Sequence, residues 1–271
     1  MQNKILTGRA YLLGAALLAF FTALLRTLAL TLSFDRASGY FTSGALPLLY
    51  RIIAILSLVA IVTIPPIFLR GKISPTRASL SRIGTCGALL TSLLLFMNFI
   101  VGCTIRSTIL SPLLWLMGLL SLLLSTVYFL LQTPRLAAGT STHAILGSFA
   151  ILALACLIAF TYFDITTPMN APRKMDLHMA LLAVILYLLY ELRAKTDISH
   201  PTALSVFGGL AFFLTVSVGL SDIIAYLIGV FGNPLYLVQD LLLLTLAVYI
   251  GARSFADATL SQNTTGKDHT V

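Results

Sequence analysis

The chain has 271 residues, of which 58% are hydrophobic and only 10% are charged, and its formal net charge is +8. Soluble domains carry about 25% charged residues, so a water-soluble fold of this composition would lack the charge to cover its own surface. Soluble enzymes and soluble binding domains are therefore excluded, and the mean hydropathy of +0.98 predicts a protein whose solvent is the lipid bilayer.

Long apolar runs, separated by short polar segments, extend through nearly the whole sequence. A helix needs about 20 apolar residues to cross the hydrocarbon core, and windows of this length predict eight membrane-spanning helices. They lie at residues 10–32, 46–69, 83–103, 109–131, 144–163, 175–192, 202–220 and 235–252. The runs are continuous and do not alternate with period two, which argues against a β-barrel. The predicted fold class is all-α, a polytopic transmembrane helical bundle formed by a single domain over residues 1–253.

The first apolar run follows Lys4 and Arg9, a pattern that also begins a secretory signal peptide. The run is about 23 residues long, which exceeds the about 7–15 apolar residues of a signal peptide, so we expect an uncleaved helix. Its residues Ala15, Ala19 and Ala23 recur every four positions and form one face of small side chains. Such a face lets a neighbouring helix approach closely. We expect it to pack inside the bundle, and docking of a partner membrane subunit is the alternative.

The positions of Lys and Arg predict the orientation. With the N-terminus in the cytoplasm, eleven of these residues lie in cytoplasmic segments and four in external loops, as the preference for positive charge inside requires. We therefore expect both termini in the cytoplasm, a short polar disordered tail over residues 254–271, and a location in the bacterial plasma membrane. The basic cytoplasmic loops would contact anionic lipids. Nucleic acid is not expected as a partner, because the basic residues are scattered over several short segments.

Polar residues within the predicted spans concentrate on the external side. Charges inside a membrane are rare and costly, so each of them marks a candidate site. Seven polar residues fall at a similar external depth: Arg26, Arg51, Asn98, Asp176, His178, Asp222 and Asp240. In one interpretation, Arg26 and Arg51 pair with Asp222 and Asp240 and only hold helices together. In the other, the layer lines an outward-facing pocket whose guanidinium groups suit a carboxylate or a phosphate.

A smaller candidate cluster, Glu191 and Arg193, lies at the cytoplasmic end of the sixth predicted span. Enzyme motifs such as His-Glu-x-x-His, Gly-x-Ser-x-Gly and the phosphate-binding loop are absent from the sequence. The histidines near the ends of the predicted spans lie on different segments and cannot share a metal ion. The three cysteines form no Cys-x-x-Cys pair. We therefore expect no metal and no cofactor. These features favour a protein that is not an enzyme.

Three segments of the C-terminal third resemble a group of uncharacterised bacterial multi-pass membrane proteins: LLYELR at 188–193, DLLLL at 240–244 and YIGAR at 249–253. The resemblance implies no activity, but it draws attention to the polar residues Glu191, Arg193, Asp222 and Asp240. We expect a non-enzymatic protein that binds or senses a small or lipidic ligand, or an accessory subunit of a membrane protein partner. A substrate-specific transporter with an external polar pocket is the alternative, and an intramembrane enzyme acting on lipids is a third hypothesis.

Overall fold

A computed structural model of the protein describes residues 2–68, 80–104, 112–133, 140–164, 167, 168, 170–195 and 201–265. This part of the chain contains eight helices that are long and apolar enough to cross a membrane. They are α1 (Gln2–Leu32), α2 (Ala45–Phe68), α3 (Arg82–Thr104), α4 (Pro112–Leu130), α5 (Thr140–Tyr162), α6 (Pro172–Lys195), α7 (Pro201–Leu227) and α8 (Pro234–Thr265). The predicted all-α class is confirmed, and each predicted span overlaps one of these helices.

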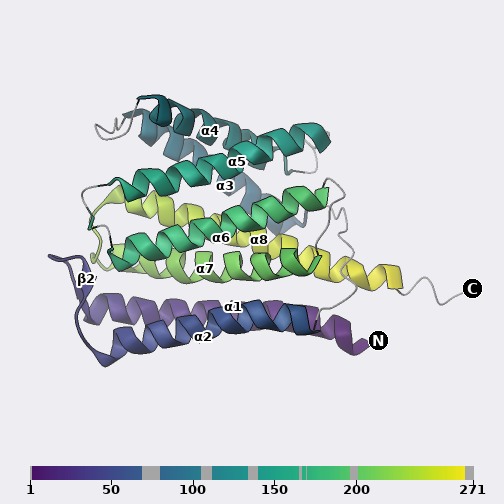
Figure 1. The fold of residues 1–271 in the computed structure, drawn as a ribbon, viewed down its shortest axis with the longest axis horizontal. Helices are drawn as coiled ribbons and strands as arrows, with labels where there is room; N and C mark the ends of the chain where they lie inside the picture. The colour runs from purple at the N-terminus through teal and green to yellow at the C-terminus, as the bar shows by residue number, and fades with distance from the viewer. Residues whose placement is uncertain are drawn as a thin grey trace, which may run out of the picture.

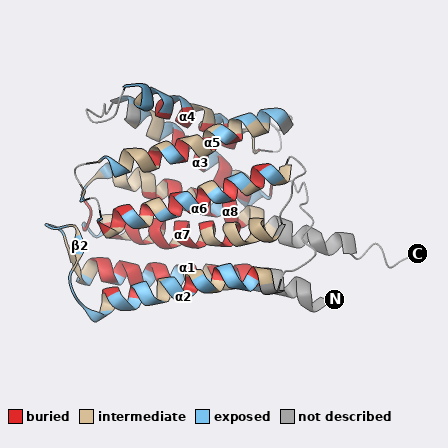
Figure 2. Cartoon of the chain, in the orientation of Figure 1, coloured by how far each residue is buried: buried red, intermediate tan, exposed pale blue. Residues whose placement is uncertain are grey.

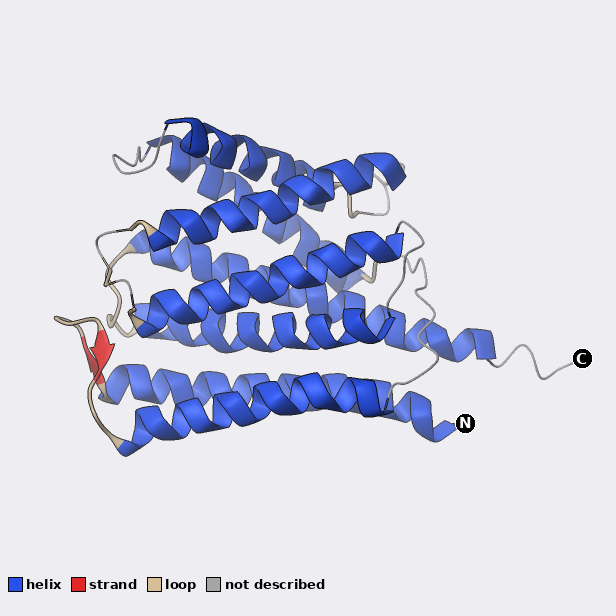
Figure 3. Cartoon of the chain, viewed as in Figure 1, coloured by secondary structure: helices blue, strands red, loops and turns tan. Residues whose placement is uncertain are grey.

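The helices run side by side, and Figure 1 places the start of α1 and the end of α8 at the same end of the bundle. We call this the terminal end. At the opposite end, which we call the hairpin end, β1 (Phe34–Asp35) and β2 (Tyr40–Phe41) pair antiparallel (Figure 3). Hydrogen bonds from Ser38 and from the amide of Ala37 lower the pKa of the Asp35 carboxyl in the hairpin turn. Gly39 completes the turn with a φ of 75°, a conformation that glycine adopts at little cost.

Helix α7 forms the centre of the bundle and packs against α1, α2, α6 and α8. The packing then continues from α8 to α3, and through α4 and α5 back to α6. Half of the candidate membrane-spanning window is buried in both α1 and α7, against 22% in α2. Helix α2 is therefore peripheral, and it is held mainly by α1 and α7 (Figure 2).

Exposed residues lie along the outer faces of the helices (Figure 2), and many of them are large and apolar. Leu17, Leu32 and Leu227, for example, are more than 70% exposed. Monomeric soluble proteins rarely expose apolar surface of this extent. This exterior is consistent with a multi-pass membrane protein.

Two helices continue beyond their predicted ends. Helix α7 extends past the predicted span, residues 202–220, to Leu227, because Ser221 and Asp222 are buried with partners inside the bundle and do not interrupt it. Helix α8 continues to Thr265, whereas we expected a disordered tail from residue 254. The sequence holds no proline or glycine between residues 252 and 265, so no residue there favours an earlier end.

The face of small residues on α1 is buried inside the helical bundle. Ala15, Ala19 and Ala23 are each at most 2% exposed, and α1 packs chiefly on α7. The close approach that small side chains permit is therefore used within the bundle, and this face is not open to a partner subunit.

Candidate functional site

Four helices bring charged side chains together inside the hairpin end of the bundle. Arg26 of α1 is fully buried, and its guanidinium pairs with Asp222 of α7 and donates from Nε to Asp176 Oδ2 of α6, over 2.9 Å. The same guanidinium donates to the hydroxyl of Ser221. A buried charge is tolerated only when it is paired and hydrogen-bonded, and these partners meet that requirement for Arg26.

Arg173, in the first turn of α6, forms the second half of the cluster. Its Nη2 donates to both carboxylate oxygens of Asp240 on α8, at 3.0 and 2.8 Å, and its Nε lies 3.7 Å from Asp222 Oδ2. The guanidinium lies over the ring of Tyr236, 3.8 Å from the centroid, a geometry in which the ring face attracts the cation. Asp222 therefore joins the two halves, and we call the five charged residues the ion-pair network: Arg26, Arg173, Asp176, Asp222 and Asp240.

Four of the seven residues in the predicted external layer belong to this network, namely Arg26, Asp176, Asp222 and Asp240. One of the two interpretations paired Arg51 with Asp222 or Asp240, and the structure does not show this pair. Arg51 is exposed, and it forms no ion pair with any described carboxylate. The partner of Asp240 is Arg173, which lies just before the sixth predicted span, residues 175–192. Pro172 indicates an earlier start of this helix, because proline is frequent at the first position of a helix. The residues that follow it, Arg173 among them, then lie in the first turn.

The other two residues of the predicted layer lie apart from the network. His178 is on α6, but its Nε2 lies 2.7 Å from the hydroxyl of Thr161 on α5. Asn98 donates from Nδ2 to the carbonyl of Leu94 within α3, a helix that packs on α4 and α8. The sequence therefore indicated the depth of both residues along their helices, but not the side of the helix from which they project.

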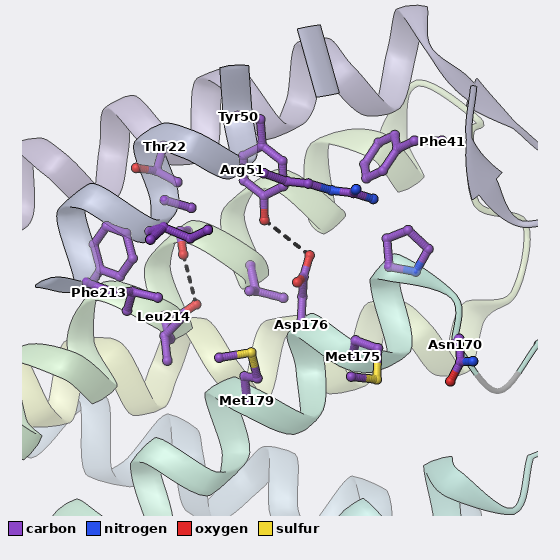
Figure 4. Close-up of a pocket in the computed structure, with 16 residues that line it drawn as sticks. Thr22, Phe41, Tyr50, Arg51, Asn170, Met175, Asp176, Met179, Phe213 and Leu214 are labelled. Atoms are coloured by element: carbon purple, nitrogen blue, oxygen red, sulfur yellow. Dashed lines mark hydrogen bonds between the residues drawn. The ribbon is translucent and has the colours of Figure 1, made fainter. Parts of the chain in front are cut away.

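A cavity of about 320 Å³ lies beside the network, between α2 and α6, with α1 and α7 behind it (Figure 4). Its α2 wall consists of Tyr50, Arg51, Ala54, Ile55 and Leu58. Its α6 wall includes Met175, Asp176 and Met179, and α7 contributes Phe213, Leu214, Ser217 and Val218. Asp176 is the one residue of the ion-pair network that lines this cavity.

The cavity opens on the side of the bundle. Ile55, Met175 and Met179 line it and are nevertheless 60%, 48% and 46% exposed, so the space between α2 and α6 reaches the outer surface of the helices. On its inner side, Thr22 of α1 is buried and its hydroxyl has no hydrogen-bond partner among the described residues. The cavity therefore extends from the lateral surface to the buried face of α1.

Asp176 is held in a fixed orientation at the edge of this cavity. Tyr50 donates its hydroxyl to Asp176 Oδ2 over 3.2 Å, and Arg26 donates to the same oxygen (Figure 4). The side chain of Asp176 is 24% exposed, whereas those of Asp222 and Asp240 are fully buried. The negative charge of the network can be reached from the cavity only at Asp176.

The second candidate cluster lies at the terminal end. Glu191 of α6 is buried and accepts a hydrogen bond of 2.7 Å from Tyr249 Oη of α8. Lys195 Nζ and Arg253 Nε lie 3.4 and 3.7 Å from the same carboxylate oxygen. Arg193, the other predicted member, is exposed and stacks on Tyr190 instead. The cluster therefore ties α6 to α8.

Replacing Glu191 by glutamine tests whether this carboxylate holds the terminal end together. Glutamine can still accept from Tyr249, but Lys195 and Arg253 lose their negative partner, so we expect the free energy of unfolding to fall by about 1–3 kcal/mol. Arg193→Gln is the control and should cost less than about 1 kcal/mol, because this side chain is exposed. Unfolding of the purified protein by a denaturing detergent measures both, and equal losses would contradict the assignment.

Comparison with protein families, with curated proteins and with solved structures gives no match to this chain. The chemistry of the site is the level at which the function of a fold is determined.

Proposed function

We propose that this chain is a multi-pass protein of the bacterial plasma membrane that binds a small or lipidic ligand in the cavity between α2 and α6. In this proposal it is not an enzyme, and it acts as a sensor or as an accessory subunit of another membrane protein. The observation that carries the proposal is a cavity of about 320 Å³ that is mostly apolar but has Asp176 and Arg51 in its lining. Ligand sites commonly combine an apolar cavity of roughly 300–1,000 Å³ with a few polar groups that fix the orientation.

The distribution of polar residues favours an amphipathic ligand. Tyr50 and Arg51 lie near the start of α2 and Asp176 near the start of α6, so the polar groups gather toward the hairpin end. Leu58 and Met179 lie further toward the terminal end. A ligand with its polar group near the hairpin end and an apolar chain along the helices would match this gradient. It could enter from the side, where the cavity meets the surface that would face lipid tails.

The hairpin end is external in this proposal. The excess of Lys and Arg in the segments assigned to the cytoplasm supports this orientation. The ligand would then come from the external half of the bilayer. Helix α2 is the least buried of the candidate spans, so a ligand held between α2 and α6 would act on the helix that the bundle restrains least.

Transport is the second candidate function, and one observation favours it. The cavity reaches Phe213, which lies near the middle of the candidate span Thr202–Leu227, and carriers place their substrate sites near the bilayer midplane. Proteoliposomes with a fluorescent phospholipid in one leaflet distinguish the two functions. Protein-dependent movement of this lipid to the other leaflet would support transport, whereas binding without movement would support sensing.

Filling the cavity tests the binding site directly. Ala54→Trp places a large ring among the lining residues, so we expect it to reduce lipid binding by about tenfold or more, equivalent to about 1.4 kcal/mol. The measurement is cross-linking of a phospholipid that carries a diazirine in its acyl chain, with the labelled residues identified by mass spectrometry. Wild-type labelling should concentrate on α2 and α6 around Ile55, Met175 and Met179.

Leu56→Trp is the matched control, because Leu56 is 62% exposed on the same helix and does not line the cavity. It should leave the labelling unchanged. If Ala54→Trp labelled as strongly as Leu56→Trp, the cavity would not be the binding site, and the proposed function would lose the observation that supports it.

A further inference from the structure

The ion-pair network carries an excess of negative charge. It contains three carboxylates, Asp176, Asp222 and Asp240, and two guanidinium groups, those of Arg26 and Arg173. Asp222 and Asp240 are fully buried against the two arginines. Both hydrogen bonds to Asp176 go to Oδ2, so Oδ1 has no hydrogen-bond partner among the described residues. The unbalanced charge is therefore accessible at Asp176, in the wall of the cavity.

The nearest remaining cations do not neutralise this charge by contact. Lys174 follows Arg173 on α6, but its ammonium group donates to the backbone carbonyls of Tyr162, Asp164 and Thr167, over 2.8–3.3 Å. Arg51 lines the same cavity, but it makes no ion pair with a described carboxylate. The cavity therefore presents a negative group on α6 and a separate positive group on α2.

We infer, on the premise of the proposed function, that the cavity selects an amphiphile whose polar end carries an ammonium group. Asp176 Oδ1 is the partner of this group, and Arg51 takes the phosphate or carboxylate that adjoins it. The surrounding side chains, among them Met175, Met179 and Leu214, are apolar. In such surroundings an ionic group binds favourably only when it meets a complementary charge, and an ammonium group on Asp176 would satisfy both partners.

The proposed ligand carries a positive group, whereas the sequence indicated only an anion. In that interpretation the guanidinium groups of Arg26 and Arg51 suited a carboxylate or a phosphate. In the structure, the guanidinium groups of Arg26 and Arg173 are occupied by aspartates, and the fully buried part of the network is closed to a ligand. The accessible groups are Asp176 and Arg51, so the charge pattern of the cavity suits a zwitterion.

The test compares lipids that share two oleoyl chains and differ only in the head group. Native mass spectrometry of the purified protein measures binding of phosphatidylethanolamine, N-acetylated phosphatidylethanolamine and phosphatidylglycerol. Phosphatidylethanolamine should bind about tenfold more tightly than the other two, because a charge-assisted contact worth about 1.4 kcal/mol changes affinity by this factor. The N-acetylated lipid keeps the phosphate and lacks the ammonium group, so this comparison needs no variant of the protein.

Single substitutions test which residues cause the preference for phosphatidylethanolamine. Asp176→Asn should abolish the preference for phosphatidylethanolamine, whereas Asp35→Asn, which removes an exposed carboxylate outside the cavity, should keep it. Arg51→Gln should weaken the binding of all three phospholipids and keep the preference for phosphatidylethanolamine, and Arg36→Gln in the hairpin is its control. Competition by phosphoethanolamine identifies the source of the zwitterion: displacement of the lipid would indicate a soluble ligand, and its absence a membrane lipid.

Two results would overturn the inference and leave the proposed function standing. One is equal binding of the three lipids by the wild-type protein, and the other is an unchanged preference in a folded Asp176→Asn variant, in both cases with binding that Ala54→Trp abolishes. Lipid binding that Ala54→Trp leaves intact would overturn the proposed function as well, since no ligand would then occupy the cavity.

Discussion

Replacing Asp222 by asparagine is expected to lower the free energy of unfolding by about 3–5 kcal/mol, the usual cost of removing one partner from a buried ion pair. Asp222 is fully buried, pairs with Arg26 and lies 3.7 Å from Arg173 Nε. Without its charge, Arg26 keeps only Asp176 as an anionic partner, and Arg173 keeps only Asp240. Two guanidinium groups in the interior would each lose compensation from a single substitution.

A double-mutant cycle measures this pairing, with unfolding in detergent micelles as the readout. Asp222→Asn and Arg26→Gln should show a coupling energy of about 1 kcal/mol or more, because residues of one ion-pair network are not additive. Asp222→Asn combined with Arg51→Gln is the control and should be additive within about 0.5 kcal/mol. Coupling to Arg51 as large as that to Arg26 would contradict the arrangement of the network.

Replacing Gly87 by leucine is expected to force α3 away from α8 and to cost about 3 kcal/mol, the upper part of the range for overpacking a core. A Cβ atom at Gly87 would lie 2.9 Å from the backbone nitrogen of Tyr249 and 3.2 Å from the backbone carbon of Val248. These atoms belong to the main chain of α8 and cannot rotate away as a side chain would. The helix itself would have to shift, and with it Tyr249, the hydrogen-bond donor to Glu191.

Gly14→Leu provides the matched control, because a Cβ at Gly14 meets no atom within 4 Å. Leucine favours the helix over glycine by up to about 1 kcal/mol, so this variant should be as stable as the wild type or slightly more stable. Thermal unfolding monitored by circular dichroism compares the two. A Gly87→Leu protein as stable as Gly14→Leu would show that α3 and α8 are not packed as closely as described.

The sequence predicted the number of helices and their approximate bounds, because crossing a bilayer demands a continuous apolar run that one-dimensional hydropathy detects. It also predicted that Arg26, Asp176, Asp222 and Asp240 share a layer, since depth follows from the rise per residue. Its failures have a common cause. Asn98 and His178 have suitable depths, but they project away from the ion-pair network. Arg51 lines the cavity without pairing with Asp222 or Asp240. The side of a helix from which a residue projects is not reported by a hydropathy window.

Neither the role of Arg173 nor the cavity was predicted from the sequence. Arg173 was missed because hydropathy placed the start of the sixth span after it, although α6 begins at Pro172. The cavity exists because α2 packs on α1 and α7 while α6 packs on α5 and α7, which leaves a space between α2 and α6. Such a space follows from the neighbours of each helix, and these are fixed only by the tertiary fold.

The guanidinium of Arg26 also has a consequence for how the protein is made. Its partners Asp176 and Asp222 follow it by 150 and 196 residues, so at about 5–20 residues per second the ribosome needs about 10–40 s to supply both. During this interval α1 carries an unpaired charge toward the hairpin end, where insertion costs at most the about 2.5–3.5 kcal/mol of a charge at the bilayer centre. In the membrane proposed for this protein, α1 would therefore not reach its final position until α7 has been synthesised. The first helix to be synthesised would then be among the last to pack, because its packing requires helices of the C-terminal half.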